Sequence, residues 1–181
     1  MSVSLGPNGL AQSGGIAMPL INKDHNASTN VVSGTSENSA WQTLFSSNYT
    51  PNAAGNLLKI TIFMSCGVAN SGSSNYRYGA LGTAVSVNNS IISTLGRSEN
   101  TKNYYGNRIW FRHDNSSGSS NTHEATFREP TVAYYTSVST SSISIEALYR
   151  PTDFTGTNHW NFGYHSWRRN KSEILVEEFG Q

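Results

Sequence analysis

The chain closes with the stretch Ser172-Glu173-Ile174-Leu175-Val176-Glu177-Glu178-Phe179, which has the composition of a β-strand. Three consecutive apolar residues at its middle, Ile174 to Val176, predict a strand that is covered on both faces there. A core that includes this strand is incomplete until the strand has been made. We therefore expect deletion of the C-terminus to prevent folding.

A second strand precedes it at Ser142 to Tyr149, where apolar and polar residues alternate. This period of two predicts one buried and one exposed face, and only Leu148 breaks the pattern. Between the two strands lies an aromatic segment, Trp160 to Trp167. Its alternating rings are typical of a core or of a subunit interface.

The most apolar strand of the chain is predicted at Leu57 to Cys66. One face of it carries Leu58, Ile60, Ile62 and Met64, and the other carries Leu57 and Phe63. A strand with apolar residues on both faces is expected at the centre of a sheet.

The other apolar runs are short, and turn-forming residues follow each of them. Apolar residues nowhere recur at helical spacing over three turns, and no repeat of fixed period is found. The expected fold is all-β, an antiparallel β-sandwich of jelly-roll type.

Residues 1–29 differ from the rest of the chain, because they combine four glycines and two prolines with one short apolar run. Such a segment cannot form a core alone, so we predict an extended N-terminal arm that becomes ordered on another subunit. The sandwich domain would then span residues 30–181. The apolar residues of the arm that would make the contact are Ile16, Met18, Leu20 and Ile21. A disordered leader is the alternative.

Ser, Asn, Thr and Gly contribute 80 of the 181 residues, whereas 13% of the residues are charged. This composition predicts a turn-rich and largely uncharged surface. The net charge of +1 gives no overall field that would hold nucleic acid or an anionic membrane. The sequence shows no signal peptide and no apolar stretch of membrane-spanning length, so we expect a soluble protein made in a cytoplasm.

Residue types that could carry chemistry do not form a recognisable site. His113-Asp114 and His123-Glu124 are adjacent pairs, and neighbours on a strand point to opposite faces, so neither pair predicts a catalytic dyad. His159 and His165 would lie about 20 Å apart in an extended chain, too far to share a metal. The single cysteine, Cys66, is expected to be a buried thiol. We expect no enzyme activity, no metal and no cofactor.

Aromatic residues beside Asn, Ser and Thr give the remaining functional signal. Rigid rings bind the apolar faces of a sugar or protein, and amides and hydroxyls bind the polar rim. The candidate contact residues are Tyr76, Tyr78, Tyr104, Tyr105 and Trp110. Tyr104 and Tyr105 lie in a polar loop and are the ones expected to be exposed. That the aromatic clusters belong to the core stays an open alternative.

The order of several features resembles a known group of proteins. These features are Tyr49-Thr50-Pro51 before the apolar strand from Leu57, the strand Tyr76-Arg77-Tyr78-Gly79, Phe127-Arg128-Glu129-Pro130 before the Thr/Ser-rich segment from Tyr135 to Tyr149, and the closing stretch from Ser172. In this order, residues 30–181 resemble the small all-β virion proteins and tail-fibre head domains of bacteriophages, especially of marine and cyanobacterial phages. Glu129 stands where that group often has aspartate. The group offers no set of functional residues to transfer.

The resemblance implies a structural protein of a phage virion that is made in the host cytoplasm. It would be a fibre or appendage head domain, a homotrimer anchored to other virion proteins by its N-terminal arm, and would contact a host surface glycan or protein. No nucleic acid and no membrane insertion are expected. A capsid decoration (cement) protein and a free lectin-like carbohydrate-binding module, or a glycan-active enzyme, stay open as alternatives.

Overall fold

The structure, a computed structural model, describes residues 3–6, 9–12, 17–34, 40–70, 76–92, 98–99, 102–103, 107–114, 123–152, 158–163 and 171–180. It describes side chains over residues 18–34, 40–66, 82–92, 130–151 and 171–180. All regular elements in the described ranges are β-strands, as the sequence predicts. No helix in these ranges is long and apolar enough to cross a membrane.

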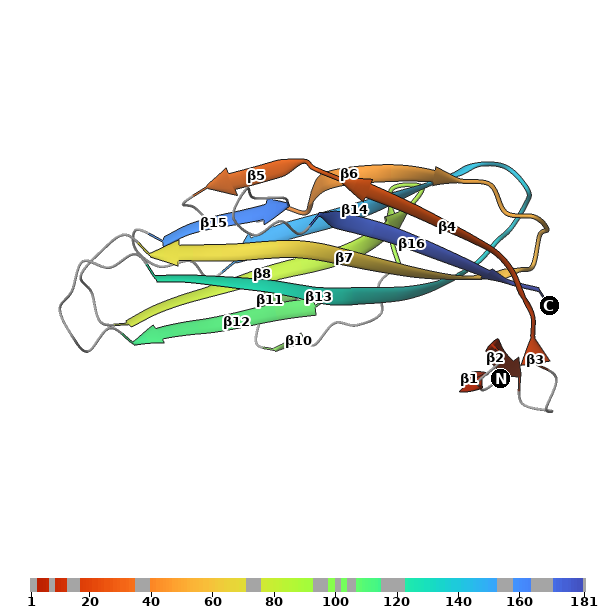
Figure 1. The fold of residues 1–181 in the computed structure, drawn as a ribbon, viewed down its shortest axis with the longest axis horizontal. Coiled ribbons are helices and arrows are strands. Elements are labelled where there is room, and N and C mark those ends of the chain that lie inside the picture. The colour runs from red at the N-terminus through yellow and green to blue at the C-terminus, as the bar shows by residue number, and fades with distance from the viewer. Residues whose placement is uncertain are drawn as a thin grey trace.

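One sheet holds six strands (Figure 1). Because two strands can lie end to end at the same position across the sheet, the six strands occupy four positions, which we call columns. They are β4 (Leu20–Ser28), β5 (Val31–Gly34), β7 (Leu57–Asn70), β13 (His123–Thr136), β15 (Asn158–Gly163) and β16 (Ser172–Phe179). β13 pairs with β7 along its whole length, so β15 and β16 share the other edge of β7, end to end. β5 and β4 pair in turn with β15 and β16. The central position predicted for the strand from Leu57 is therefore confirmed.

The second sheet also has four columns. Its strands are β6 (Gln42–Tyr49), β8 (Tyr76–Val87), β9 (Ser90–Ile91), β12 (Asn107–Asp114) and β14 (Ile143–Thr152). β14 occupies one edge of β8, and β12 and β9 share the other edge. β6 pairs with the far side of β14 and closes the order β12-β8-β14-β6.

The two sheets are antiparallel throughout and face each other, which confirms the predicted β-sandwich. If the eight columns are numbered along the chain, the first sheet has the order 1-8-3-6 and the second 2-7-4-5. The first and last columns are therefore neighbours. This pairing joins β4 and β16, which lie close to the two ends of the chain.

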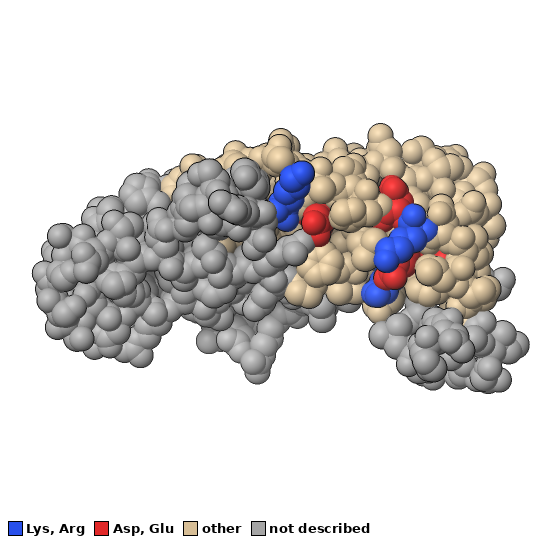
Figure 2. Space-filling view, viewed as in Figure 1, with Lys and Arg blue, Asp and Glu red and all other residues tan. Residues whose placement is uncertain are grey.

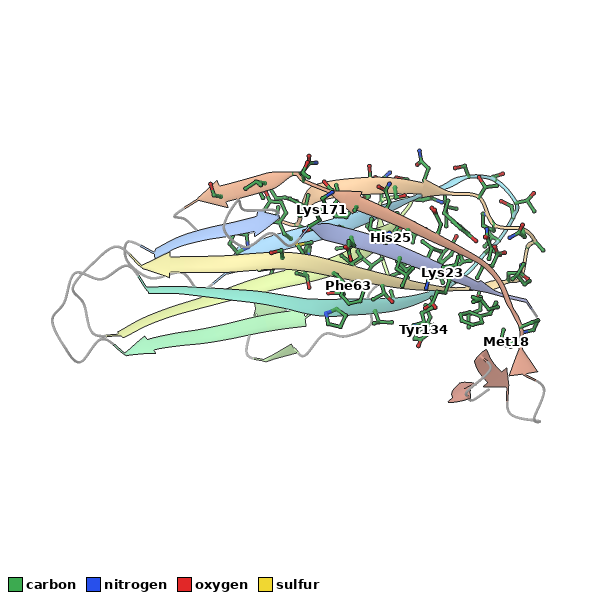
Figure 3. The ribbon with its side chains drawn as sticks, viewed as in Figure 1. Met18, Lys23, His25, Phe63, Tyr134 and Lys171 are labelled. Atoms are coloured by element: carbon green, nitrogen blue, oxygen red, sulfur yellow. The ribbon has the colours of Figure 1, made fainter. Side chains whose placement is uncertain are left out.

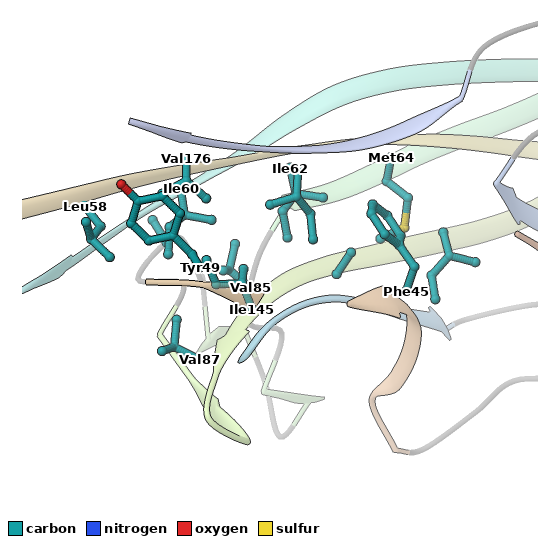
Figure 4. Close-up of a cluster of buried hydrophobic side chains, with 14 of the residues drawn as sticks. Phe45, Tyr49, Leu58, Ile60, Ile62, Met64, Val85, Val87, Ile145 and Val176 are labelled. Atoms are coloured by element: carbon teal, nitrogen blue, oxygen red, sulfur yellow. The ribbon is translucent and has the colours of Figure 1, made fainter. Parts of the chain in front are cut away.

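The core lies between the sheets and is built from strands that alternate as the sequence predicts. Leu58, Ile60, Ile62 and Met64 of β7 are at most 1% exposed. Figure 4 shows them against side chains of the other sheet, namely Phe45, Val85, Val87 and Ile145. Cys66 is also fully buried, so the expectation of a buried thiol is confirmed.

Two details of the strands differ from their sequence patterns. Leu175 is only half-buried between the buried Ile174 and Val176, so β16 alternates and is not covered on both faces. Leu148 lies opposite Ala84 on the outward side of β14, and both are nonetheless buried. The partner strand β6 has a bulge here, because Thr43 pairs with Leu148 while Phe45 pairs with Ala147, leaving Leu44 as the extra residue.

The sandwich begins earlier than the expected boundary at residue 30, because β4 already pairs with β16 over Leu20–Ser28. β4 is an outer column, and all but the last of its residues are exposed. Two amides bridge this column to β6, the outer column of the facing sheet. Asn26 Nδ2 donates to Ser47 Oγ at 3.1 Å, and Asn30 Nδ2 donates to the carbonyl of Leu44 at 3.0 Å.

Short strands precede the sandwich and follow β9. β1 (Val3–Gly6), β2 (Gly9–Gln12) and β3 (Ala17–Met18) form a small sheet of their own, and β10 (Ser98–Glu99) pairs with β11 (Lys102–Asn103). Figure 1 shows the small N-terminal sheet at the end of the sandwich where the C-terminus lies.

Candidate functional site

Three of the five predicted contact residues lie on strands that are neighbours in the second sheet. The inward side of β8 is fixed by Thr83, whose hydroxyl shares a hydrogen bond with that of Thr131 in the facing sheet, and by Val85 and Val87 in the core. Since side chains alternate along a strand, the positions of Tyr78 and Tyr76 fall on the outward side with Gly82.

β12 brings the third residue to the same face. Trp110 pairs with Ala80 and Arg112 with Tyr78, so the outward positions of β12 lie beside the two tyrosines. Arg108 pairs with Gly82 one step further along. We call the positions that the register places on this side the outward face of the second sheet: Tyr76, Tyr78, Gly82, Ala84, Ser86, Arg108, Trp110, Arg112, Asp114, Glu146, Leu148 and Arg150, with Trp41 beside them. Of these, Ala84, Ser86 and Leu148 are buried.

Two described residues of this face, Trp41 and Arg150, meet at Gly82. Arg150 pairs with Gly82 from the other side, and its guanidinium carbon lies 5.2 Å from the centre of the Trp41 ring. A β-carbon built at Gly82 would lie 3.1 Å from Trp41 Cη2 and 3.3 Å from the carbonyl oxygen of Arg150. The ring of Trp41 therefore reaches across β14 to β8, because Gly82 leaves room for it. A cation held against an aromatic ring in this way stabilises the position of both.

Sequence reasoning missed the arginines of this face, although one signal was available. Asn107-Arg108-Ile109-Trp110-Phe111-Arg112 alternates, so a strand here places Arg108 and Arg112 on the same side as Trp110. Trp41 and Arg150 could not be connected to them from the sequence, because their meeting depends on the order of the columns. Tyr104 and Tyr105, the other two predicted contact residues, lie outside the described residues.

Of the four predicted assembly residues, Met18 is buried against the sandwich, whereas Leu20 and Ile21 are exposed. Met18 is 4% exposed and packs against Phe179 and Leu57 of the sandwich. Gly180 N–H donates to the carbonyl of Pro19 at 3.0 Å, which fixes the N-terminal segment beside the end of β16 (Figure 3). Leu20 and Ile21 are each 48% exposed and remain available for a further contact. Ile16 lies outside the described residues.

A buried carboxylate that the sequence did not reveal lies between the sheets. Glu178 is completely buried, and its oxygens accept hydrogen bonds from Tyr49 Oη at 2.6 Å and from Asn56 Nδ2 at 2.6 Å. Asn52 donates to it twice, from its backbone N–H at 2.8 Å and from Nδ2 at 2.7 Å. These bonds join the last strand to β6 and to the turn that follows it.

The balance of burial and hydrogen bonding sets the charge of this group. Burial raises the pKa of Glu178, but the hydrogen bonds from Asn56, Tyr49 and Asn52 outweigh it, so that the pKa is lower than the usual 4.5. The pKa of Tyr49 is raised, first by burial and then by its hydrogen bond to Glu178 and the charge of that carboxylate. The site therefore holds an ionised carboxylate and a protonated phenol, which suits a structural role.

The outward face of the first sheet carries charges of both signs (Figure 2). Lys59 Nζ lies 2.7 Å from Glu177 Oε2, and His25 Nε2 lies 3.8 Å from Glu173 Oε2. Among the residues that the structure describes, no three His, Cys, Asp or Glu side chains are grouped to hold a metal ion.

No protein-family model matches this chain, and no curated protein matches it. Among solved structures it is similar to that of infectious bursal disease virus, Gx strain, with 13% identity, a TM-score of 0.34 and coverage of 99% of this chain and 40% of that chain. It is also similar to the VP2 subviral particle of the same virus, with 12% identity, a TM-score of 0.34 and coverage of 98% and 42%. The chain thus spans less than half the length of these proteins. A likeness at this TM-score does not bear on function.

Proposed function

We propose that this protein is a structural component of a bacteriophage virion, a homotrimeric fibre or appendage head domain. Its N-terminal segment attaches it to other virion proteins, and the outward face of the second sheet contacts the host surface. The protein acts by binding and catalyses no reaction.

The observation that carries this proposal is the small sheet β1-β2-β3. Within the described residues it pairs with no strand of the sandwich, and the chain leaves it through Met18 and Pro19. Three strands of two to four residues cannot bury enough surface to be stable alone. Such a sheet is stabilised when it packs on a neighbouring subunit, and the exposed Leu20 and Ile21 extend the surface available for that contact.

The order of the columns supports the same proposal at the level of architecture. We interpret the orders 1-8-3-6 and 2-7-4-5 as a jelly roll, in which strands taken in turn from two sheets wrap around one core. Jelly rolls occur in viral capsid proteins and in lectins. Because one fold hosts many functions, the architecture only makes the role possible, and the N-terminal sheet provides the specific argument.

A second candidate, a free lectin-like module, is favoured by one observation. The outward face of the second sheet combines aromatic residues with arginines, which a carbohydrate-binding protein also needs. A capsid decoration protein would use the same N-terminal segment as a clamp. The position of the protein separates the three roles.

The test is to label purified particles with an antibody against the sandwich and to compare the full chain with a chain lacking residues 1–16. We expect label on a fibre or appendage for the full chain. The truncated chain should keep its β-type circular dichroism and its melting transition but be absent from particles, because β1 and β2 are lost while Met18 and β4 remain. Label on the capsid shell would replace the fibre role by decoration. A protein never found on particles would contradict the proposal.

A further inference from the structure

We propose that the open edge of β13 pairs with the same edge of a second copy of this chain, in antiparallel orientation about a twofold axis. The contact joins the first sheets of two copies into one continuous sheet. It goes beyond the proposed function, since it neither requires nor replaces attachment through the N-terminal segment.

The first argument is that β13 pairs on one side only. β7 covers one edge of it over the whole of residues 123–136, and no strand that the structure describes pairs with the other edge. Figure 1 shows β13 at the margin of the first sheet. A long edge of this kind is a template for a further strand, because the backbone groups that face outward have no partner.

The last residues of β13 form the more open part of this edge. β12, the outer strand of the facing sheet, begins at Asn107, which pairs with Thr83. The hydroxyl of Thr83 shares a hydrogen bond with that of Thr131. β12 therefore runs beside β13 up to Thr131, and residues 132–136 extend beyond it. There the facing column continues, among the described residues, only with the two residues of β9.

The hydrogen bonds of Ser137 show which backbone groups point to the open side. Its N–H donates to the carbonyl of Asn56 at 2.9 Å, in continuation of the ladder between β13 and β7. Residues that bond to the neighbouring strand alternate with residues that do not. The N–H and C=O groups of Val132, Tyr134 and Thr136 therefore point away from β7.

The second argument is the absence of charge on this edge. No charged residue occurs between Pro130 and Ile145. β4, the other outer strand of the first sheet, carries Lys23, Asp24 and His25, and charges of this kind protect an edge from other strands. In a twofold contact each stretch meets the same stretch of the other copy, so a stretch without charge meets no repulsion. This edge therefore suits a copy of itself as its partner.

A twofold axis at Ala133 matches the side chains of the two copies. It places Val132 of each copy opposite Tyr134 of the other, on the outward face of the first sheet (Figure 3). Tyr134 is 47% exposed and Val132 is half-buried. Aromatic and β-branched residues that lie opposite each other stabilise an antiparallel pair, and the symmetry forms this pair twice. The same axis sets Pro130 opposite Thr136, so the new ladder ends at a residue that has no N–H to donate.

The experiment measures the mass of the full-length protein by sedimentation velocity over a range of concentrations. Wild type should form a dimer or, where the trimer of the proposed function also forms, a hexamer of two trimers. Tyr134→Lys should halve this mass and raise the dissociation constant about tenfold or more. The reason is that the change removes two cross-strand pairs and brings two cations into one interface.

Two further variants make the test specific. Val31→Lys is the matched control, because Val31 is also 47% exposed and lies on β5, at the opposite margin of the first sheet. It should leave the mass unchanged. Tyr134→Pro removes an N–H that points to the open side, as Pro130 already does in the same strand, so the fold should persist while the contact is lost.

Amide hydrogen exchange of wild type gives a readout that needs no variant. The amides of Val132, Tyr134 and Thr136 should exchange slowly at high protein concentration and quickly after dilution. The amides of Ala133 and Tyr135 bond to β7 by the same alternation, so they should stay slow at both concentrations.

A wild-type mass of one or three chains at all concentrations, an equal effect of Val31→Lys, or exchange of the three amides that does not depend on concentration would overturn the inference. Protection of these amides only on intact particles would assign the edge to another virion protein and would overturn it as well. These outcomes are distinct from failure of the proposed function. A dimer that never occurs on particles keeps the contact and loses the virion role, whereas a trimer on particles with an open β13 keeps the virion role and loses the contact.

Discussion

Glu178 accepts four hydrogen bonds inside the sandwich, and the groups that donate them lie more than 120 residues earlier in the chain. Tyr49 belongs to the second sheet and Glu178 to the first, so one carboxylate connects both layers (Figure 4 shows Tyr49). An unpartnered buried charge would be strongly destabilising, whereas here the donors replace the lost water. The carboxylate thus stabilises the turn at Asn52 and Asn56 together with the last strand.

Replacing Glu178 by glutamine should lower the free energy of unfolding by about 3 kcal/mol, because the new amide presents a donor to groups that are themselves donors. The measurement is chemical denaturation. The matched control is Glu177→Gln at the neighbouring position, where Lys59 is the partner on the partly exposed outward face. We expect the control to change stability by less than about 1 kcal/mol. Equal effects of the two changes would contradict the role given to Glu178.

The depressed pKa of Glu178 also predicts the direction of a pH effect. A carboxyl group whose pKa is lower in the folded chain than the usual 4.5 stabilises the fold above that pH, and this stabilisation is lost as the pH falls through the folded-state pKa. Melting temperatures of wild type should therefore decrease below about pH 4.5. In Tyr49→Phe, which removes one of the donors that lower this pKa, the decrease attributable to Glu178 should be smaller. An unchanged pH profile in that variant would exclude the coupling.

At this scale the sequence could predict burial better than hydrogen bonding. The alternation of Leu58, Ile60 and Ile62 was sufficient to place them in the core. Glu178, by contrast, follows Glu177 in a stretch that is typical of a strand leaving the core. The period of two places Glu178 on the same face as Ile174 and Val176. Its hydrogen bonds could not be predicted, because the donors come from a distant turn.

β16 contributes to both the sheet and the core along its length. It pairs with β4 on one edge and β7 on the other, and it brings Ile174, Val176 and Glu178 into the interior. β4 lies at the margin and buries almost none of its residues. The two neighbouring strands therefore contribute very differently to stability, although both lie close to an end of the chain.

Deletion of residues 172–181 should abolish the cooperative melting transition, because it exposes the edge of β7 and removes the carboxylate that joins the sheets. Deletion of residues 1–25, which removes most of β4, should leave a folded but less stable protein than deletion of residues 1–16. Thermal melts followed by circular dichroism compare the three truncations. Equal melting temperatures of the two N-terminal truncations would show that β4 adds nothing, and cooperative melting without residues 172–181 would contradict the role of β16.

The sequence predicted the strongly apolar elements and missed β4 for a physical reason. Leu20-Ile21-Asn22-Lys23-Asp24-His25-Asn26-Ala27-Ser28 has no buried face, so no periodicity marks it as a strand. Its strand conformation comes from backbone pairing with β16 alone, which is a long-range property. In the sequence alone, such a segment cannot be distinguished from an extended arm.

For the whole molecule, the sandwich could be predicted from many short strands, but the columns could not be ordered. The proposed binding face depends on that order, because it combines Trp41 before β6, Arg150 on β14 and the paired strands β8 and β12. The residue types of Tyr76, Tyr78 and Trp110 predict a contact role, but their common face follows only from the register. The small sheet β1-β2-β3 could not be predicted either, because the sequence indicates only an extended arm there.

The two amide bridges between β4 and β6 bear on how the protein behaves when a cell makes it in quantity. An all-strand protein with open margins can add copies of itself edge to edge and grow into insoluble, amyloid-like stacks. Asn30 binds a main-chain carbonyl of β6, and Asn26 links the two margins at Ser47, so one side of the sandwich is fastened to itself. These bonds leave less of this margin open to pairing with a second copy.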